Sequence, residues 1–140
     1  MTTVNIRWFG AYDLDSLDGK QIIMNKGIYA IYRVYGGKET LIYIGKTKRN
    51  FLKRLKEHNK DWLWKVRGEI RIRFGVLEFP NGGKYSEQKL ADVESLLISW
   101  HEPVENTQST KYYYGRPNLE VINEGRRGLI DKKISTIKYT

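Results

Sequence analysis

Two short strand-like segments on either side of a glycine pair constrain this chain more than any other feature of its sequence. Residues 27–34 and 40–45 are rich in β-branched and aromatic side chains, and Gly36-Gly37 between them is a turn signal. These segments favour a β-hairpin. Residues 50–65 follow directly and have the spacing of a basic amphipathic helix, so we expect the hairpin to lead straight into that helix.

The register of this hairpin decides where two of its tyrosines lie. Side chains alternate between the faces of a strand, so a two-residue loop would put Tyr29 opposite Ile44. Tyr29 and Tyr43 would then point to opposite faces. A loop with an odd number of residues, or a bulge, would put both tyrosines on one face. We predict the odd loop.

Three further segments have the periodicity of regular structure. Asn50 is a candidate N-cap for the helix over 50–65, and Ser86 is one for a second helix over 86–101. Residues 69–79 begin with strict alternation, which predicts a strand with one dry and one basic face. The apolar stripes of the two helices are Phe51, Leu55, His58 and Trp62 in the first and Leu90, Val93, Leu97 and Trp100 in the second.

These elements predict an α+β fold. Its centre is a small mixed or antiparallel β-sheet of about three core strands, flanked by α-helices. The apolar stretch from Val4 to Tyr12 and the segment 119–122 are candidates for extra edge strands from the termini. Residues 112–117 are expected to form a loop, and the end of the chain a basic tail without periodicity.

Length and composition favour one globular domain, because 140 residues with 40% hydrophobic side chains can bury a core. The domain is expected over 1–140, with a core at about 27–106 between extensions 1–26 and 107–140. The chain has no cysteine, which excludes disulfides and thiolate metal sites. No apolar run is long enough to span a membrane, and the first residues lack signal-peptide features, so we expect a cytoplasmic protein.

Positive charge is concentrated in two stretches. The net charge is +9, and basic residues far outnumber acidic ones between Lys46 and Arg73. A second cluster near the end of the chain holds Arg126, Arg127, Lys132 and Lys133. Concentrated positive charge attracts a phosphate backbone and releases its counterions, which points to nucleic acid. The alternative is a solvated basic face without a partner.

Several motifs occur in one order along the chain. They are Gly27-Ile28-Tyr29, Tyr43-Ile44-Gly45, the pair Arg54 and His58, then Glu94, then Asn106. In this order, each in the expected type of element, they resemble the GIY-YIG nuclease superfamily. The resemblance covers roughly residues 27–106 and implies a small mixed sheet and one-metal hydrolysis of DNA. A histidine on the helix resembles the restriction and homing branches of that superfamily.

The resemblance implies a role for each motif residue. Glu94 would bind one Mg²⁺ or Mn²⁺, because a hard carboxylate oxygen suits these ions. Arg54 can fork onto two phosphate oxygens and stabilise the transition state. Asn106 is expected to order the backbone of the site. An ordinary boundary glutamate and a solvated helix arginine are the structural alternatives for Glu94 and Arg54. His101, two turns after Glu94, is expected to be structural.

Tyr29 is our candidate general base, with Tyr43 as its hydrogen-bonded neighbour. A phenol has an ordinary pKa near 10, so nearby positive charge must favour its phenolate. His58 could accept the tyrosine proton, since imidazole titrates near neutrality. Strand packing is the structural alternative for the tyrosines, and a core position is the alternative for His58.

The expected partner is double-stranded DNA, bound by basic side chains around these motifs. The candidate DNA-binding residues are Lys46, Lys48, Arg49, Lys53, Arg116, Arg126 and Arg127. Tyr112, Tyr113 and Tyr114 can either stack on bases or pack against the sheet. A lone catalytic domain is compatible with a homodimer in which each subunit cuts one strand.

A metal-dependent DNA endonuclease, of restriction type among other branches, is therefore the leading hypothesis. A structure-specific, repair or mobile-element nuclease is an alternative within the same chemistry. A non-catalytic nucleic-acid-binding module that retains the fold is a second hypothesis. A purely structural interaction protein is a third, and it leaves the basic concentration unexplained.

Overall fold

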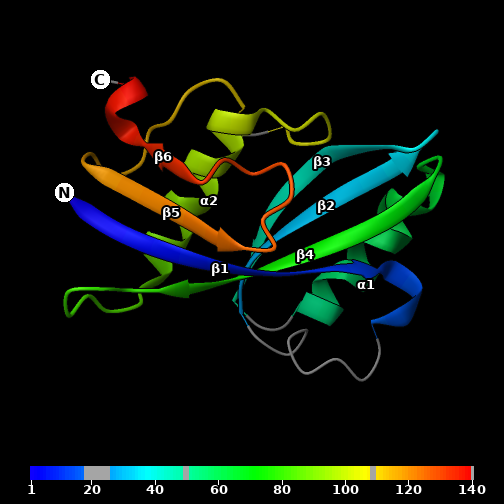
Figure 1. Ribbon diagram of the computed structural model, residues 1–140, viewed down its shortest axis with the longest axis horizontal. Helices are drawn as coiled ribbons and strands as arrows, with labels where there is room; N and C mark the ends of the chain where they lie inside the picture. The colour runs from blue at the N-terminus through cyan, green and yellow to red at the C-terminus, as the bar shows by residue number, and fades with distance from the viewer. Residues whose placement is uncertain (18–25, 49–50, 108–109, 140) are drawn as a thin grey trace.

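The computed structural model describes residues 1–17, 26–48, 51–107 and 110–139 (Figure 1). A long first strand precedes the hairpin, and a helix, a strand, a second helix and two more strands follow it. The bounds are β1 Thr2–Asp13, β2 Gly27–Tyr35, β3 Lys38–Thr47, α1 Phe51–Asp61, β4 Glu69–Glu78, α2 Glu87–His101, β5 Leu119–Gly125 and β6 Lys133–Ser135. Short 3-10 helices lie at Leu14–Ser16, Leu63–Lys65 and Thr136–Tyr139.

Within these ranges, six strands form one curled mixed sheet in the spatial order β3-β2-β4-β1-β5-β6 (Figure 1). Neighbouring strands are antiparallel except for the parallel pair β1 and β5. The predicted α+β class is confirmed, but the sheet is larger than the expected about three core strands. In the described part of the chain, no helix has the length and apolarity needed to cross a membrane.

Strand β5 lies between β1 and β6, so the expected place of residues 119–122 at an edge is wrong. Strand β1 also lies inside the sheet, and its expected place at an edge is wrong. It pairs with β4 on one side and with β5 on the other. Val4, Ile6 and Trp8 are buried and alternate with more exposed side chains. The C-terminal segment is folded as well, since β6 pairs with β5 and the N–H of Asn123 donates to the carbonyl of Lys132 at 2.6 Å. The expectation of a tail without regular structure is therefore also wrong.

The hairpin turns at Gly36 and Gly37. Tyr35 pairs with Lys38 across a two-residue turn, so the predicted odd loop is wrong. Both glycines have positive φ, 60° and 79°. Two-residue turns with this backbone match the twist of the flanking strands, and glycine adopts it without steric cost.

A bulge in β3, the alternative to the odd loop, is what places the motif tyrosines together. The register shifts between Ile31 and Tyr32, so that Tyr32 pairs with Leu41 but Ile31 pairs with Tyr43. Residues directly opposite each other in an antiparallel pair share a face. Tyr43 therefore lies on the face of Ile31 and Tyr29, which confirms the expectation that the two tyrosines share a face.

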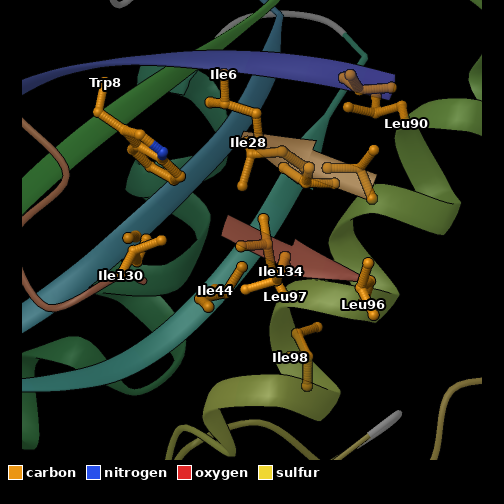
Figure 2. Packing of buried hydrophobic residues seen from close by; sticks show 14 of the residues in the cluster. Ile6, Trp8, Ile28, Ile44, Leu90, Leu96, Leu97, Ile98, Ile130 and Ile134 are labelled. Atoms are coloured by element: carbon orange, nitrogen blue, oxygen red, sulfur yellow. The ribbon is translucent and has the colours of Figure 1, made fainter. Parts of the chain in front are cut away.

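Helix α2 covers one face of the sheet. The predicted stripe residues Leu90, Val93 and Leu97 are fully buried, together with side chains from β1, β2, β3 and β6 (Figure 2). The hydroxyl of Ser86 accepts a hydrogen bond from the N–H of Lys89 at 3.1 Å, which confirms the N-cap. This face has an apolar core that fixes α2 against the hairpin.

Helix α1 covers the opposite face. Its predicted stripe is buried at Phe51, Leu55 and His58, where it packs with the cluster of Tyr29 and Phe74. The helix ends at Asp61, and a 3-10 turn replaces the last turn that the sequence predicted. The candidate cap Asn50 lies outside the described residues.

Candidate active site

Tyr29 extends over the edge strand because the residue beside it has no side chain. β3 is at the edge of the sheet, and its Gly45 is the direct partner of Tyr29 on β2. A Cβ at Gly45 would lie 2.5 Å from the Tyr29 Oη and 2.8 Å from the Tyr43 Cε1. The Tyr29 ring therefore crosses Gly45 and lies beside Tyr43, with ring centroids 6.1 Å apart and an interplanar angle of 30°.

His58 on α1 meets the hydroxyl of Tyr29. The Tyr29 Oη and the His58 Nε2 are 2.6 Å apart, and both side chains are buried. On the other side of the imidazole ring, the indole N–H of Trp62 donates to the His58 Nδ1 at 3.0 Å. Burial, and then the nearby charge of Arg54, lower the pKa of His58 to about 4, so the ring is neutral at neutral pH.

Arg54 places positive charge beside the two phenols. Burial raises the pKa of Tyr29 well above its ordinary value, the neighbouring Tyr43 raises it further, and Arg54 opposes both effects. The Arg54 Nη1 is 2.9 Å from the Glu57 Oε2, one turn along the helix. This ion pair holds the guanidinium in place. The guanidinium is also partly exposed, so a phosphate can still reach it.

Glu94 approaches from α2. The Lys46 Nζ on β3 lies 3.2 Å from the Glu94 Oε1, in an ion pair that is only partly exposed. Burial raises the pKa of Glu94, while Lys46 opposes this shift. After burial, the charge of Glu94 is the largest cause that raises the pKa of Tyr43. The carboxylate is therefore close enough to the phenols to act on their charge state.

Asn106 binds the free edge of β3. Its side-chain amide donates to the carbonyl of Ile44 and accepts from the N–H of Ile44, both at 2.9 Å. The N–H of Glu105 also donates to the carbonyl of Ile42 at 2.8 Å. Asn106 thus takes the place of a neighbouring strand, and it holds the backbone between Tyr43 and Gly45.

The six motif residues are brought together, but the predicted DNA-binding residues are not all near them. Lys46 is in the site, and Lys48 follows it in an ion pair with Glu87 at 3.1 Å. Lys53 is exposed on the first turn of α1. Arg49 lies outside the described residues.

The three C-terminal arginines have structural contacts away from the Tyr29 hydroxyl. The Arg116 Nε pairs with the buried Asp92 at 2.9 Å. Arg126 and Arg127 lie in a loop tied to Tyr32, whose hydroxyl donates to the Arg127 carbonyl at 3.2 Å. Tyr32 belongs to the α2-side core, and so this loop lies on the opposite face of the sheet from Tyr29.

Of the three consecutive tyrosines at 112–114, two lie at the surface and one is buried, and the second histidine, His101, contacts the backbone. The rings of Tyr112 and Tyr114 are exposed and stacked, with centroids 5.4 Å apart. Tyr113 is buried and donates its hydroxyl hydrogen to the Arg116 carbonyl at 2.6 Å. His101 bonds backbone groups at both ring nitrogens, so its contacts are structural.

A family comparison agrees with this geometry. The model of the GIY-YIG catalytic domain matches residues 25–113. This chain belongs to the GIY-YIG family. Membership supports endonuclease activity, that is, hydrolysis of phosphodiester bonds, as its general chemistry. Searches of curated proteins and of solved structures gave no match to the chain.

The GIY-YIG match leaves the central strand β1 and the strands β5 and β6 outside its bounds, although they complete the sheet. Sequence reasoning assigned no role in the site to Trp62 and Glu57. Both had a local signal, because Trp62 is four residues after His58 and Glu57 three after Arg54, which are neighbouring positions on a helix. The helical stripe predicts only a packing role for Trp62.

Proposed function

We propose that this protein is a divalent-metal-dependent endonuclease that hydrolyses double-stranded DNA. The observation that carries the proposal is the convergence of two tyrosines, a histidine, an arginine and a carboxylate at the edge strand β3. The contributing residues are Tyr29, Tyr43, His58, Arg54 and Glu94. Because β3 is an edge strand, a duplex can approach Tyr43, Arg54 and Glu94, which are partly exposed, while Tyr29 and His58 lie buried behind them.

The donor set suits one Mg²⁺ or Mn²⁺. Glu94 offers a hard carboxylate oxygen, and the described residues contain no group of three or more histidine and acidic side chains that could enclose an ion. Mg²⁺ commonly binds through one or two carboxylates and keeps several waters, so a single glutamate is sufficient. When bound, the ion would supply positive charge to the phosphoryl and leaving oxygens.

The side chains of the chain supply the remaining chemistry. Arg54 favours the phenolate of Tyr29 against the effect of burial, and as a phenolate Tyr29 takes a proton from a water molecule while the water oxygen forms a bond to phosphorus. The bond from phosphorus to the leaving oxygen breaks, and that oxygen receives a proton from solvent. Arg54 binds the non-bridging oxygens and stabilises the additional negative charge. Lys46 neutralises part of the charge that accumulates beside Glu94.

DNA would approach along the basic residues nearest the site. Lys46, Lys48 and Lys53 lie at the end of β3 and on the start of α1, so they can contact the phosphates that flank the cut. A duplex could contact the more distant arginines only if it extended past the site; these are Arg116, Arg126 and Arg127. A homodimer would let each subunit cut one strand of a restriction-type site.

The test is cleavage of supercoiled plasmid by the purified protein in Mg²⁺ or Mn²⁺. Glu94→Gln should lose cleavage and keep DNA binding, because it removes the anionic ligand but preserves the shape of the side chain. Glu87→Gln is a matched control on the same helix and should cleave as the wild type does. Cleavage retained by Glu94→Gln would refute the metal assignment, and end-sequencing would separate discrete restriction-type ends from scattered nicks.

A non-catalytic DNA-binding module is the second candidate. The ion pair between Lys46 and Glu94 favours it, because Lys46 already compensates the charge that a metal would need. This candidate predicts salt-sensitive DNA binding and no cleavage in either metal. Lys46→Met separates the two candidates, since it should strengthen Mn²⁺ binding at Glu94 only if the metal competes with Lys46.

A further inference from the structure

The hydrogen-bond partners of His58 determine which of its ring nitrogens carries hydrogen. The indole N–H of Trp62 can only donate, and it points at the His58 Nδ1 from 3.0 Å. The Nδ1 must therefore present its lone pair. In a neutral imidazole the hydrogen is then on the Nε2, which lies 2.6 Å from the Tyr29 Oη. His58 consequently donates to Tyr29 and has no lone pair there with which to accept a proton.

His101 has the opposite arrangement. Its Nδ1 lies 2.9 Å from the Leu97 carbonyl, which can only accept, so the hydrogen is on the Nδ1. Its Nε2 accepts the backbone N–H of Asp131 at 3.0 Å. The chain contains two histidines, and the structure therefore assigns them opposite tautomers. His101 bonds only backbone groups through these contacts, whereas His58 bonds two side chains.

We propose that Trp62 is a positioning residue that fixes His58 as the Nε2–H tautomer, so that His58 donates a hydrogen bond to the Tyr29 oxygen and stabilises its phenolate. This inference rests on the proposed nuclease function, in which Tyr29 is the base. It reverses the role that the sequence suggested for His58. The hydrogen of the Tyr29 hydroxyl then points away from His58, and because Tyr29 is fully buried its proton leaves past the partly exposed Tyr43.

The geometry around Trp62 supports a specific role for its N–H. Its ring packs against Tyr43 and His58, with centroids 5.5 and 5.7 Å away, and its N–H points at the one imidazole nitrogen that Tyr29 does not occupy. Trp62→Phe keeps an aromatic ring in this position and removes the donor. Trp64→Phe is a matched control, because Trp64 lies in the adjacent 3-10 turn and is 66% exposed.

The decisive measurement is nitrogen-15 NMR of the two histidine rings, which reports each tautomer without any need for cleavage. In the wild type we expect hydrogen on Nε2 of His58 and on Nδ1 of His101, and a coupling across the hydrogen bond between the Trp62 Nε1 and the His58 Nδ1. In Trp62→Phe the two His58 nitrogen shifts should move toward each other. The His101 signals should stay unchanged in both tryptophan variants, which also reports that the fold is intact.

Kinetics supply the second measurement. Trp62→Phe should lower kcat by roughly fivefold to tenfold, the effect of losing about one neutral hydrogen bond, and leave KM unchanged. Trp64→Phe should change neither. Hydrogen on Nδ1 of His58 in the wild type, or an unchanged His58 tautomer in Trp62→Phe, would overturn the inference. If the wild type cuts no DNA, the proposed function fails, while the NMR result still decides the tautomer.

Discussion

The two ends of the sheet use buried polar side chains in different ways. At the β1-β5-β6 end, the indole N–H of Trp8 donates to the Asn123 side chain at 2.9 Å, and Asn123 donates to the Asp131 carbonyl at 2.9 Å. At the β3-β2-β4 end, the chain of contacts runs from Trp62 through His58 to Tyr29, beside a partly exposed ion pair. The first network is closed by protein groups. The second ends at the buried Tyr29, next to Tyr43 and Arg54, which are partly exposed near the sheet edge.

We therefore expect the first network to contribute mainly to stability and the second mainly to the proposed chemistry. A closed, satisfied network holds a unique core arrangement, and each of its members is costly to remove. A network that ends at an accessible edge can change its charge state when a ligand arrives. Figure 2 shows the apolar packing of α2 against the sheet, in which Trp8 of the first network takes part, whereas Tyr29 belongs to the separate cluster on the α1 side. Substitutions at the two ends should therefore affect different measurements.

The largest expected effect is on cleavage. Tyr29→Phe removes the proposed base, and the rate should fall by about a thousandfold while DNA affinity stays unchanged. Tyr32→Phe is the matched control on the opposite face of β2, where the hydroxyl bonds the Arg127 carbonyl and the N–H of Leu129. It should lower stability by about 1 kcal/mol and leave kcat unchanged. Single-turnover cleavage and urea unfolding of both variants test this assignment. A loss of cleavage in Tyr32→Phe, with cleavage retained in Tyr29→Phe, would refute it.

The next effect is on stability at the closed network. Asn123→Ala leaves the buried Trp8 N–H without its partner and also removes the hydrogen bond to the carbonyl of the exposed Asp131. The free energy of unfolding should fall by about 3 kcal/mol, because buried polar groups lose their hydrogen bonds. The folded fraction should cut DNA at the wild-type rate. A fall in kcat that matches the loss in stability would show that the two ends are coupled.

Gly45→Ala should disturb the open network without removing any polar group. A Cβ at this position would come 2.5 Å from the Tyr29 Oη, so the tyrosine ring must shift, which disturbs its contact with His58. We expect kcat to fall by about tenfold to a hundredfold, because a small displacement of a catalytic group is costly. A matched substitution at the solvent-facing turn, Gly36→Asn, should leave kcat unchanged. Equal rates for Gly45→Ala and the wild type would contradict the path assigned to the Tyr29 ring.

Local patterns in the sequence were sufficient to predict the elements that carry the candidate site. The hairpin, both helices and the α1 and α2 stripes follow from turn residues and periodicity, and so does the closeness of Arg54 to His58. The bulge in β3 was an open alternative, because nothing local in the sequence distinguishes a bulge from a longer loop. The central place of β1 was missed, since its partner β5 is remote in the chain and strand pairing has no local signal.

The sequence pattern also could not predict which way individual side-chain donors and acceptors point. A stripe at helical spacing says that Trp62 and His58 share a face, but it does not say that the indole N–H meets the imidazole Nδ1. Arg116 illustrates the same limit, because the basic composition around it does not reveal its pairing with the buried Asp92. Charge and periodicity predicted which residues gather, whereas hydrogen-bond geometry decides what each of them can do.

The smallest expected effect is a pH dependence of stability through His58. Its folded pKa is about 4, below the ordinary 6.5, so between these values the unfolded chain binds a proton that the folded protein does not. Stability from this residue is therefore complete above pH 6.5 and is lost as pH falls toward 4. From pH 6.5 to 5 the loss should be about 1.5 kcal/mol.

Urea unfolding of the wild type and of His58→Gln at both pH values isolates this contribution, because the shifts of other groups cancel in the difference. The pKa of Glu94 is raised, so its contribution to stability increases as pH falls, opposite to that of His58. The pKa of His101 is lowered, so its contribution to stability decreases as pH falls, like that of His58. His101→Gln therefore serves as a second reference. If the wild type and His58→Gln lost the same stability between the two pH values, the imidazole would not be held neutral by its place between Trp62 and Tyr29.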